Sequence, residues 1–238
     1  MFIPIRDDIP TYHKPVLTVT LIVINTLVFL YAYSLGSRGF QIFTFQYGYI
    51  PYELISSVEL TPQIAVPVWL TPFTSMFMHG GWLHLIGNML FLWIYGNNIE
   101  DYLGKIGFVV FYLFSGLAAI TLYTVFGPHS EVPLIGASGA IAGVMGAYMV
   151  LHPQARITIL FVFFFIQFIQ LPAKVVLGIW FAYQILMSIM DSATGGGVAW
   201  MAHVGGFGFG WVVMKIIVKI RGPHVRTGNG QRIYRMNW

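Results

Sequence analysis

Four polar residues occur within long apolar stretches of this sequence, and their types suit nucleophilic chemistry. They are His84 and Asn88 in "HGGWLHLIGNMLFLW", Ser138 in "GASGA" and His203 in "AHVGGFGFG". A serine hydroxyl becomes a nucleophile when a base about 2.6–3.2 Å away takes its proton, so Ser138 and His203 could form such a pair. His84, Asn88 and the backbone N–H of Ser138 could then stabilise the oxyanion.

The composition requires that these residues be held in a membrane. Of the 238 residues, 57% are hydrophobic and 8% are charged, whereas a soluble domain carries about 25% charged residues. The gaps between charges accommodate several helices of about 20 apolar residues, the length that a bilayer needs. A spanning open sheet would leave backbone groups unpaired in hydrocarbon, and the alternation typical of a lipid-facing barrel does not occur here. The sequence therefore predicts an all-α, polytopic membrane protein.

Six apolar runs predict six transmembrane helices. They cover residues 16–35, 82–99, 106–126, 136–152, 172–190 and 198–220. If the N-terminus is cytoplasmic, every Lys and Arg except Arg38 falls on the cytoplasmic side, as the positive-inside rule expects. This predicts a cytoplasmic N-terminal segment (1–15), a six-span membrane domain (16–220) and a basic cytoplasmic tail (221–238). Topology accounts for the basic tail better than nucleic-acid binding does.

Two segments of the membrane domain do not fit simple spans. The run 157–171 would reach only about 22 Å as a helix, against a hydrocarbon core of about 30 Å. Counting it as a span would also move the basic tail to the other face. We expect a cytoplasmic-side apolar excursion in contact with membrane lipid, either helix or hairpin. The segment 36–81 is too long for a simple connection and is predicted to be an outer interfacial loop between the first two helices.

The predicted topology brings the four polar residues to one depth. The second, fourth and sixth spans all begin at the outer face, so the four residues lie about 3–10 Å below it. Small-xxx-small spacing of glycines would let the fourth and sixth helices approach closely. The glycines predicted to pack around the site are Gly136, Gly139, Gly143, Gly206 and Gly210. Each polar residue alone could be structural, but polar and ionisable groups within spans are costly, and four at one depth favour a function.

Other catalytic schemes fit the sequence less well. It contains no H-E-x-x-H motif and no cysteine, and all eight acidic residues lie at or beyond the ends of the predicted spans. "GASGA" also differs from a nucleophile elbow, because glycine directly follows the serine and no strand precedes it. Metalloprotease, aspartyl protease and α/β-hydrolase mechanisms are therefore set aside, and no metal site is predicted.

The combination of motifs resembles the rhomboid intramembrane serine proteases. The motifs are His84-x-x-x-Asn88, Gly136-Ala137-Ser138-Gly139, and Ala202-His203 followed by Gly205 and Gly206. The resemblance implies a six-helix rhomboid-like bundle with a water-filled cavity open to the outer face. It implies a catalytic dyad of Ser138 and His203 without an acid, with His84 and Asn88 in the oxyanion hole. It further implies cleavage of transmembrane segments of single-pass membrane proteins near that face, without a cofactor.

The sequence departs from the family pattern at two positions. Many members have Trp-Arg where this chain has Trp69-Leu70, and many have a Tyr that stacks on the catalytic imidazole where this chain has Ala142. Another group must therefore hold His203. One alternative is a rhomboid-like pseudoprotease that binds membrane clients without cleavage, although its usual sign is loss of the Ser or His. A small transporter would instead show a mid-membrane charge or paired repeats. The compact six-span plan favours a prokaryotic cytoplasmic membrane.

Overall fold

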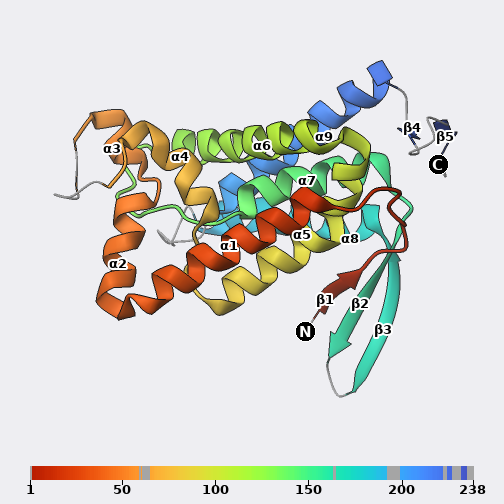
Figure 1. Cartoon of the computed structure of the whole chain (residues 1–238), viewed down its shortest axis with the longest axis horizontal. Coiled ribbons are helices and arrows are strands. Elements are labelled where there is room, and N and C mark those ends of the chain that lie inside the picture. The colour runs from red at the N-terminus through yellow and green to blue at the C-terminus, as the bar shows by residue number, and fades with distance from the viewer. Residues whose placement is uncertain are drawn as a thin grey trace.

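Six long helices form the body of the molecule (Figure 1). The computed structural model describes residues 2–58, 60, 65–162, 165–191, 199–221, 224–226 and 232–234. The long helices are α1 (Val16–Ser34), α5 (Trp82–Leu103), α6 (Lys105–Phe126), α7 (Ser138–Leu151), α8 (Ala173–Asp191) and α9 (Trp200–Arg221). Each coincides with one of the six predicted apolar runs. The predicted start of the sixth run, residue 198, lies outside the described residues.

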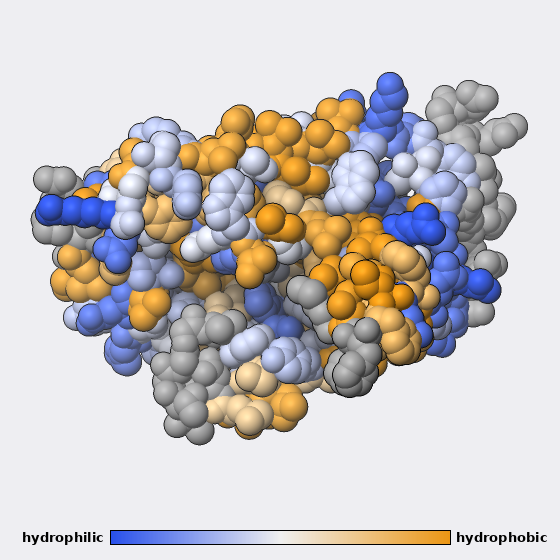
Figure 2. All heavy atoms as spheres, turned by 90° about the horizontal axis from the view of Figure 1, so that it is seen from below, coloured by the Kyte–Doolittle hydropathy of each residue, from blue (hydrophilic) through white to orange (hydrophobic). Residues whose placement is uncertain are grey.

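The surface of the bundle suits a bilayer. In Figure 2 apolar side chains cover much of the middle of one face, and hydrophilic residues gather toward its ends. Among the described residues, α1, α6, α8 and α9 are long and apolar enough to cross a membrane. Helix α7 is apolar but has only 14 residues, and polar residues such as His84 and Asn88 lower the hydropathy of α5. The helical membrane bundle is confirmed, and the count of six spans stays a prediction.

Helix α7, the shortest of these six helices, lies at the centre of the bundle. Every residue from Gly139 to Tyr148 is buried, and α7 packs against α9, α6 and α5. A helix that is apolar on all sides can be surrounded in this way, and its glycines and alanines allow the neighbouring backbones to approach. The packing leaves Ser138, the first residue of α7, partly buried at the end of this central helix.

The predicted outer loop is built from short helices. The structure shows α2 (Gly36–Tyr47), α3 (Pro51–Ser56), η1 (Val68–Leu70), α4 (Thr71–Thr74) and η2 (Ser75–Phe77). They gather at one end of the bundle, on the left of Figure 1. Two backbone hydrogen bonds between Tyr49 and Leu134 join this segment to the chain before α7. The segment therefore forms a wall beside the start of α7.

At the opposite end of the bundle, a small sheet projects to one side of the helices (Figure 1). We call this the basic end, because the ends of α6, α8 and α9 that lie there carry Lys105, Lys174, Lys219 and Arg221. Strands β1 (Phe2–Arg6), β2 (Arg156–Val162) and β3 (Ile166–Pro172) pair antiparallel in the order β1-β2-β3. The run 157–171 is therefore a hairpin, the extended one of the two forms that the sequence left open. Its β-branched and aromatic residues favour strands. The strand β1 was not predicted and is an addition to the all-α bundle.

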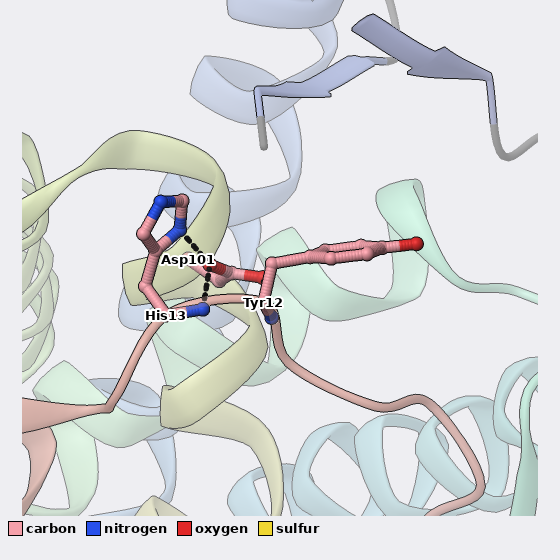
Figure 3. Close-up of polar contacts among 3 residues, drawn as sticks. All are labelled: Tyr12, His13 and Asp101. Atoms are coloured by element: carbon pink, nitrogen blue, oxygen red, sulfur yellow. Dashed lines mark hydrogen bonds and ion pairs between the residues drawn. The ribbon is translucent and has the colours of Figure 1, made fainter. Parts of the chain in front are cut away.

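Acidic side chains of α5 hold the N-terminal segment at the basic end. The carboxylate of Glu100 accepts hydrogen bonds from the backbone N–H groups of Leu17 and Thr18, at 2.9 and 2.7 Å, and so caps α1. Asp101 accepts from the N–H groups of Tyr12 and His13 (Figure 3). These contacts give the chain a fixed path into the first helix. Of the predicted basic tail, 221–238, the structure describes the end of α9 and the strands β4 (His224–Arg226) and β5 (Arg232–Tyr234). The rest lies outside the described residues.

Candidate active site

A glycine turn presents Ser138 at the start of α7. Gly136 has a φ of +131°, a conformation open to glycine and strained for other residues. Its N–H donates to the carbonyl oxygen of Ser75 at 2.9 Å, which anchors the turn to the segment of short helices that precedes α5. A Cβ atom at Gly136 would lie 2.9 Å from the imidazole of His84. Position 136 therefore needs glycine for two reasons: the backbone conformation is strained for other residues, and a side chain would crowd the ring of His84.

Helix α9 brings His203 to the serine. His203 Nε2 lies 2.8 Å from Ser138 Oγ, although 65 residues separate them in sequence. Glycines at the contact of α7 and α9 allow this approach. A Cβ atom at Gly206 would collide with the carbonyl oxygen of Gly139, and one at Gly210 would collide with that of Gly143. The glycines singled out in the sequence thus lie around Ser138 and between its helix and that of His203.

Helix α5 carries His84 and Asn88 on the other side of the turn. The Nδ1 atom of His84 accepts a hydrogen bond from the N–H of Gly80 at 3.3 Å. In a neutral imidazole the proton is then on Nε2, the ring nitrogen near Gly136. Asn88 is buried, and its Nδ2 donates to the carbonyl oxygen of His84 at 2.8 Å. One further amide hydrogen of Asn88 remains to donate. His84 can therefore offer a donor beside the serine, and Asn88 carries its spare donor one turn further along the same face of α5.

A further buried histidine lies behind His84. The ring centroids of His79 and His84 are 5.1 Å apart, in an edge-to-face arrangement. Neither ring nitrogen of His79 has a hydrogen-bond partner among the described residues. Burial, and to a smaller extent the neighbouring His84, lowers the pKa of His79 to about 3. His79 is therefore neutral at physiological pH.

The sequence analysis missed a residue that contacts His203. Gln184 of α8 is 3% exposed, and its Oε1 atom lies 2.7 Å from His203 Nδ1. The ring of Trp180, one turn earlier on α8, lies 5.8 Å from the imidazole between centroids. Trp200 approaches it edge-on at 6.4 Å. A polar amide within the apolar run 172–190 was the available signal, because polar groups within spans are uncommon.

The site holds a serine hydroxyl and a base within hydrogen-bond reach of each other. Both ring nitrogens of His203 have a partner, so its orientation is defined. A cavity of about 20 Å³ next to the serine is lined by residues that include Ser75, Met76, Gly136 and Ala202. This volume is enough for one water molecule. In the part of the chain that the structure describes, no group of three or more His, Cys, Asp or Glu residues could hold a metal ion.

Comparison with known proteins finds a matching family and relatives. Residues 67–220 match the family described as Rhomboid domain. Rhomboid protein 1, mitochondrial, from Saccharomyces cerevisiae is 32% identical over 71% of this chain and 47% of its own length. Presenilin-associated rhomboid-like protein, mitochondrial, from Bos taurus is 29% identical over 66% of this chain and 42% of its own length. Rhomboid protease GluP from Bacillus subtilis is 37% identical over 36% of this chain and 16% of its own length. The chain thus spans less than half the length of each of these relatives.

These relatives support an integral, multi-pass membrane protein and correct one expectation. Two of them are named as mitochondrial, which conflicts with the expected prokaryotic cytoplasmic membrane. Hydropathy and the distribution of Lys and Arg indicate a bilayer and the orientation within it. They carry no information about which organism's membrane it is, and the prokaryotic assignment is not retained.

Proposed function

Because the chain belongs to the rhomboid family, we propose that it is an intramembrane serine endopeptidase. Its substrates would be transmembrane segments of single-pass membrane proteins, cleaved within or near the membrane. The observation that carries the proposal is the 2.8 Å distance between Ser138 Oγ and His203 Nε2 inside a helical membrane bundle. This distance is within the range at which a base activates a serine.

The proposed reaction has two steps that use the same base. Ser138 Oγ attacks the scissile carbonyl carbon, and its proton passes to His203 Nε2. His203 then gives this proton to the leaving amine, which frees the first product and leaves an acyl-enzyme. In the second step, His203 takes a proton from water, the hydroxide attacks the ester, and Ser138 regains its proton as the second product leaves.

The oxyanion of each tetrahedral intermediate needs hydrogen-bond donors. We assign this role to His84, to Asn88 and to the backbone N–H of Ser138. The hydrogen bond from Gly80 to His84 Nδ1 supports the role, because it leaves Nε2–H free to donate. Such donors stabilise the transition state most when they are preorganised and excluded from bulk water.

The orientation in the membrane is part of the proposal. Lys105, Lys174, Lys219 and Arg221 lie at the basic end, whereas Arg38 lies at the end with Ser138. By the positive-inside rule, both termini are cytoplasmic and the active site is near the outer face. A substrate helix must unwind locally there, because its carbonyl oxygens are otherwise bonded to N–H groups one turn later. Gly or Pro near the cut should therefore favour cleavage.

The test is cleavage of tagged single-span substrates in liposomes, combined with labelling by a fluorophosphonate, which reacts with activated serines. Wild type is compared with Ser138→Ala and His203→Ala. Ser115→Ala is the matched control, because Ser115 is also a buried serine and its Oγ has no partner among the described residues. We expect cleavage and labelling by wild type and by the Ser115 variant, and neither by the other two.

Two outcomes would contradict the proposal. Product formation by Ser138→Ala would exclude this serine as the nucleophile. Absence of both cleavage and labelling in the wild type, across a panel of substrates, would favour a pseudoprotease that binds membrane clients.

A further inference from the structure

We infer that Gln184 is the positioning residue of His203, so that Ser138, His203 and Gln184 form a hydrogen-bonded chain. The inference rests on the proposed function. It starts from the observation that His203 makes two hydrogen bonds, one through each ring nitrogen. Nε2 lies 2.8 Å from Ser138 Oγ, and Nδ1 lies 2.7 Å from Gln184 Oε1.

The second hydrogen bond selects the tautomer of the imidazole. A neutral imidazole has one N–H donor and one acceptor nitrogen. The amide oxygen of Gln184 can only accept, so Nδ1 must carry the proton. Nε2 then has a free lone pair directed at Ser138, and the serine hydroxyl donates to it. The opposite tautomer would leave His203 unable to take the serine proton.

The same contact fixes the plane of the ring. Trp180 and Gln184 are four residues apart on α8 and therefore lie on one face of the helix. Trp180 packs near the imidazole ring, and Gln184 binds its Nδ1 atom. Ala142 has only a methyl group at the position where a stacking tyrosine is expected. In this chain, α8 thus supplies the support that α7 does not.

A neutral amide suits this environment better than a carboxylate. Gln184 is almost completely buried, and burying an ionised acid is unfavourable unless other groups compensate its charge. The amide orients His203 without this cost. It also stabilises the charged imidazolium less than an acid would, which distinguishes this hydrogen-bonded chain from a Ser-His-Asp triad. This difference can be measured.

The test compares Gln184→Met and Gln184→Glu with wild type. Methionine has a similar length but no strong acceptor, whereas glutamate keeps an acceptor and adds charge. The readouts are the rate of fluorophosphonate labelling of Ser138 against pH, kcat and KM for a cleaved substrate, and the thermal unfolding temperature in detergent. Gln170→Met, on the exposed strand β3, is the matched control.

The positioning role of Gln184 predicts different results for the two variants. Gln184→Met should label and turn over on the order of 10-fold to 100-fold more slowly, with KM little changed. Gln184→Glu should keep activity, and the acid limb of its pH–rate profile should move to higher pH, because a carboxylate stabilises imidazolium. Among the described residues, the titratable group that interacts with His203 is His84. It is present in all variants, so it does not produce the difference.

The outcomes separate this inference from the proposed function. If wild type labels at Ser138 and Gln184→Met labels equally fast, the positioning role is wrong and the protease remains. Loss of labelling in folded Gln184→Glu, which keeps an acceptor for Nδ1–H, would also overturn the role, and this arm decides the question if the methionine variant does not fold. If wild type does not label at all, both proposals fail together.

Discussion

Gly210 of α9 lies against the backbone carbonyl of Gly143 of α7, so closely that a Cβ atom at Gly210 would collide with that oxygen. One turn earlier, Gly206 meets the carbonyl of Gly139 in the same way. A serine side chain is short, so Ser138 and His203 can hydrogen-bond only if the two backbones are this close. The contact between glycines therefore controls the distance on which the proposed chemistry depends.

Gly210→Ala should separate the two helices. Overpacking of this kind typically costs about 1–3 kcal/mol, and we expect a lower unfolding temperature and slower fluorophosphonate labelling of Ser138. Gly208→Ala is the control, because no atom outside its own neighbours lies within 4 Å of a Cβ atom there. Both changes raise the helix propensity equally. Equal behaviour of the two variants would show that the contact does not limit the helix distance.

Asn88→Ala should slow the chemical step. Loss of one oxyanion donor lowers kcat on the order of 10²–10³-fold, or about 2.7–4 kcal/mol, with little effect on KM. Asn25→Ala on α1 is a matched control, because Asn25 Nδ2 also donates at 2.8 Å to a carbonyl one turn earlier. Steady-state kinetics of the two variants in liposomes measures the effect. A comparable loss in both would assign Asn88 a structural role.

His79→Gln should reduce the loss of stability in mild acid. The pKa of His79 is about 3 in the folded protein and about 6.5 when unfolded. The unfolded chain therefore binds the proton more readily, and the stability present above pH 6.5 decreases as the pH falls toward 3. The difference between pH 7 and pH 5 is about 2 kcal/mol for this one group. Unfolding in detergent at the two pH values measures it, with the exposed His129→Gln as control. A pH dependence unchanged from wild type would exclude His79 as its source.

The hairpin of β2 and β3 should contact lipid. Phe168 is 67% exposed, as is Ile166, and burial of such side chains in a bilayer is favourable. Because the chain contains no cysteine, a single Phe168→Cys variant can be labelled with a fluorophore in liposomes. We expect quenching by lipids that carry a quencher, and weaker quenching by an aqueous one. The exposed Gln154→Cys should show the reverse. If both positions behave like Gln154, the hairpin lies in water.

The local sequence was sufficient to predict the helices of the bundle. Each of the six longer apolar runs became a helix, from α1 at Val16 to the end of α9, whereas the shorter run 157–171 became a hairpin. The physical reason is that a chain in lipid must satisfy its backbone hydrogen bonds within each segment, so the helix depends on its own residues. The same reasoning predicted that Ser138 and His203 lie at one depth, because the rise per residue and the order of the spans can both be read from the sequence.

Other features depended on contacts between distant segments. Strand β1 pairs with β2 across more than 150 residues of sequence, and no local pattern specifies such a partner. Gln184 meets His203 because α8 turns one particular face toward α9, and the order of residues along α8 does not indicate which helix that face meets. The sequence therefore determined that this is a helical membrane protein with a serine and a histidine at one depth. Only the packing of the helices decided which side chain holds the histidine in place.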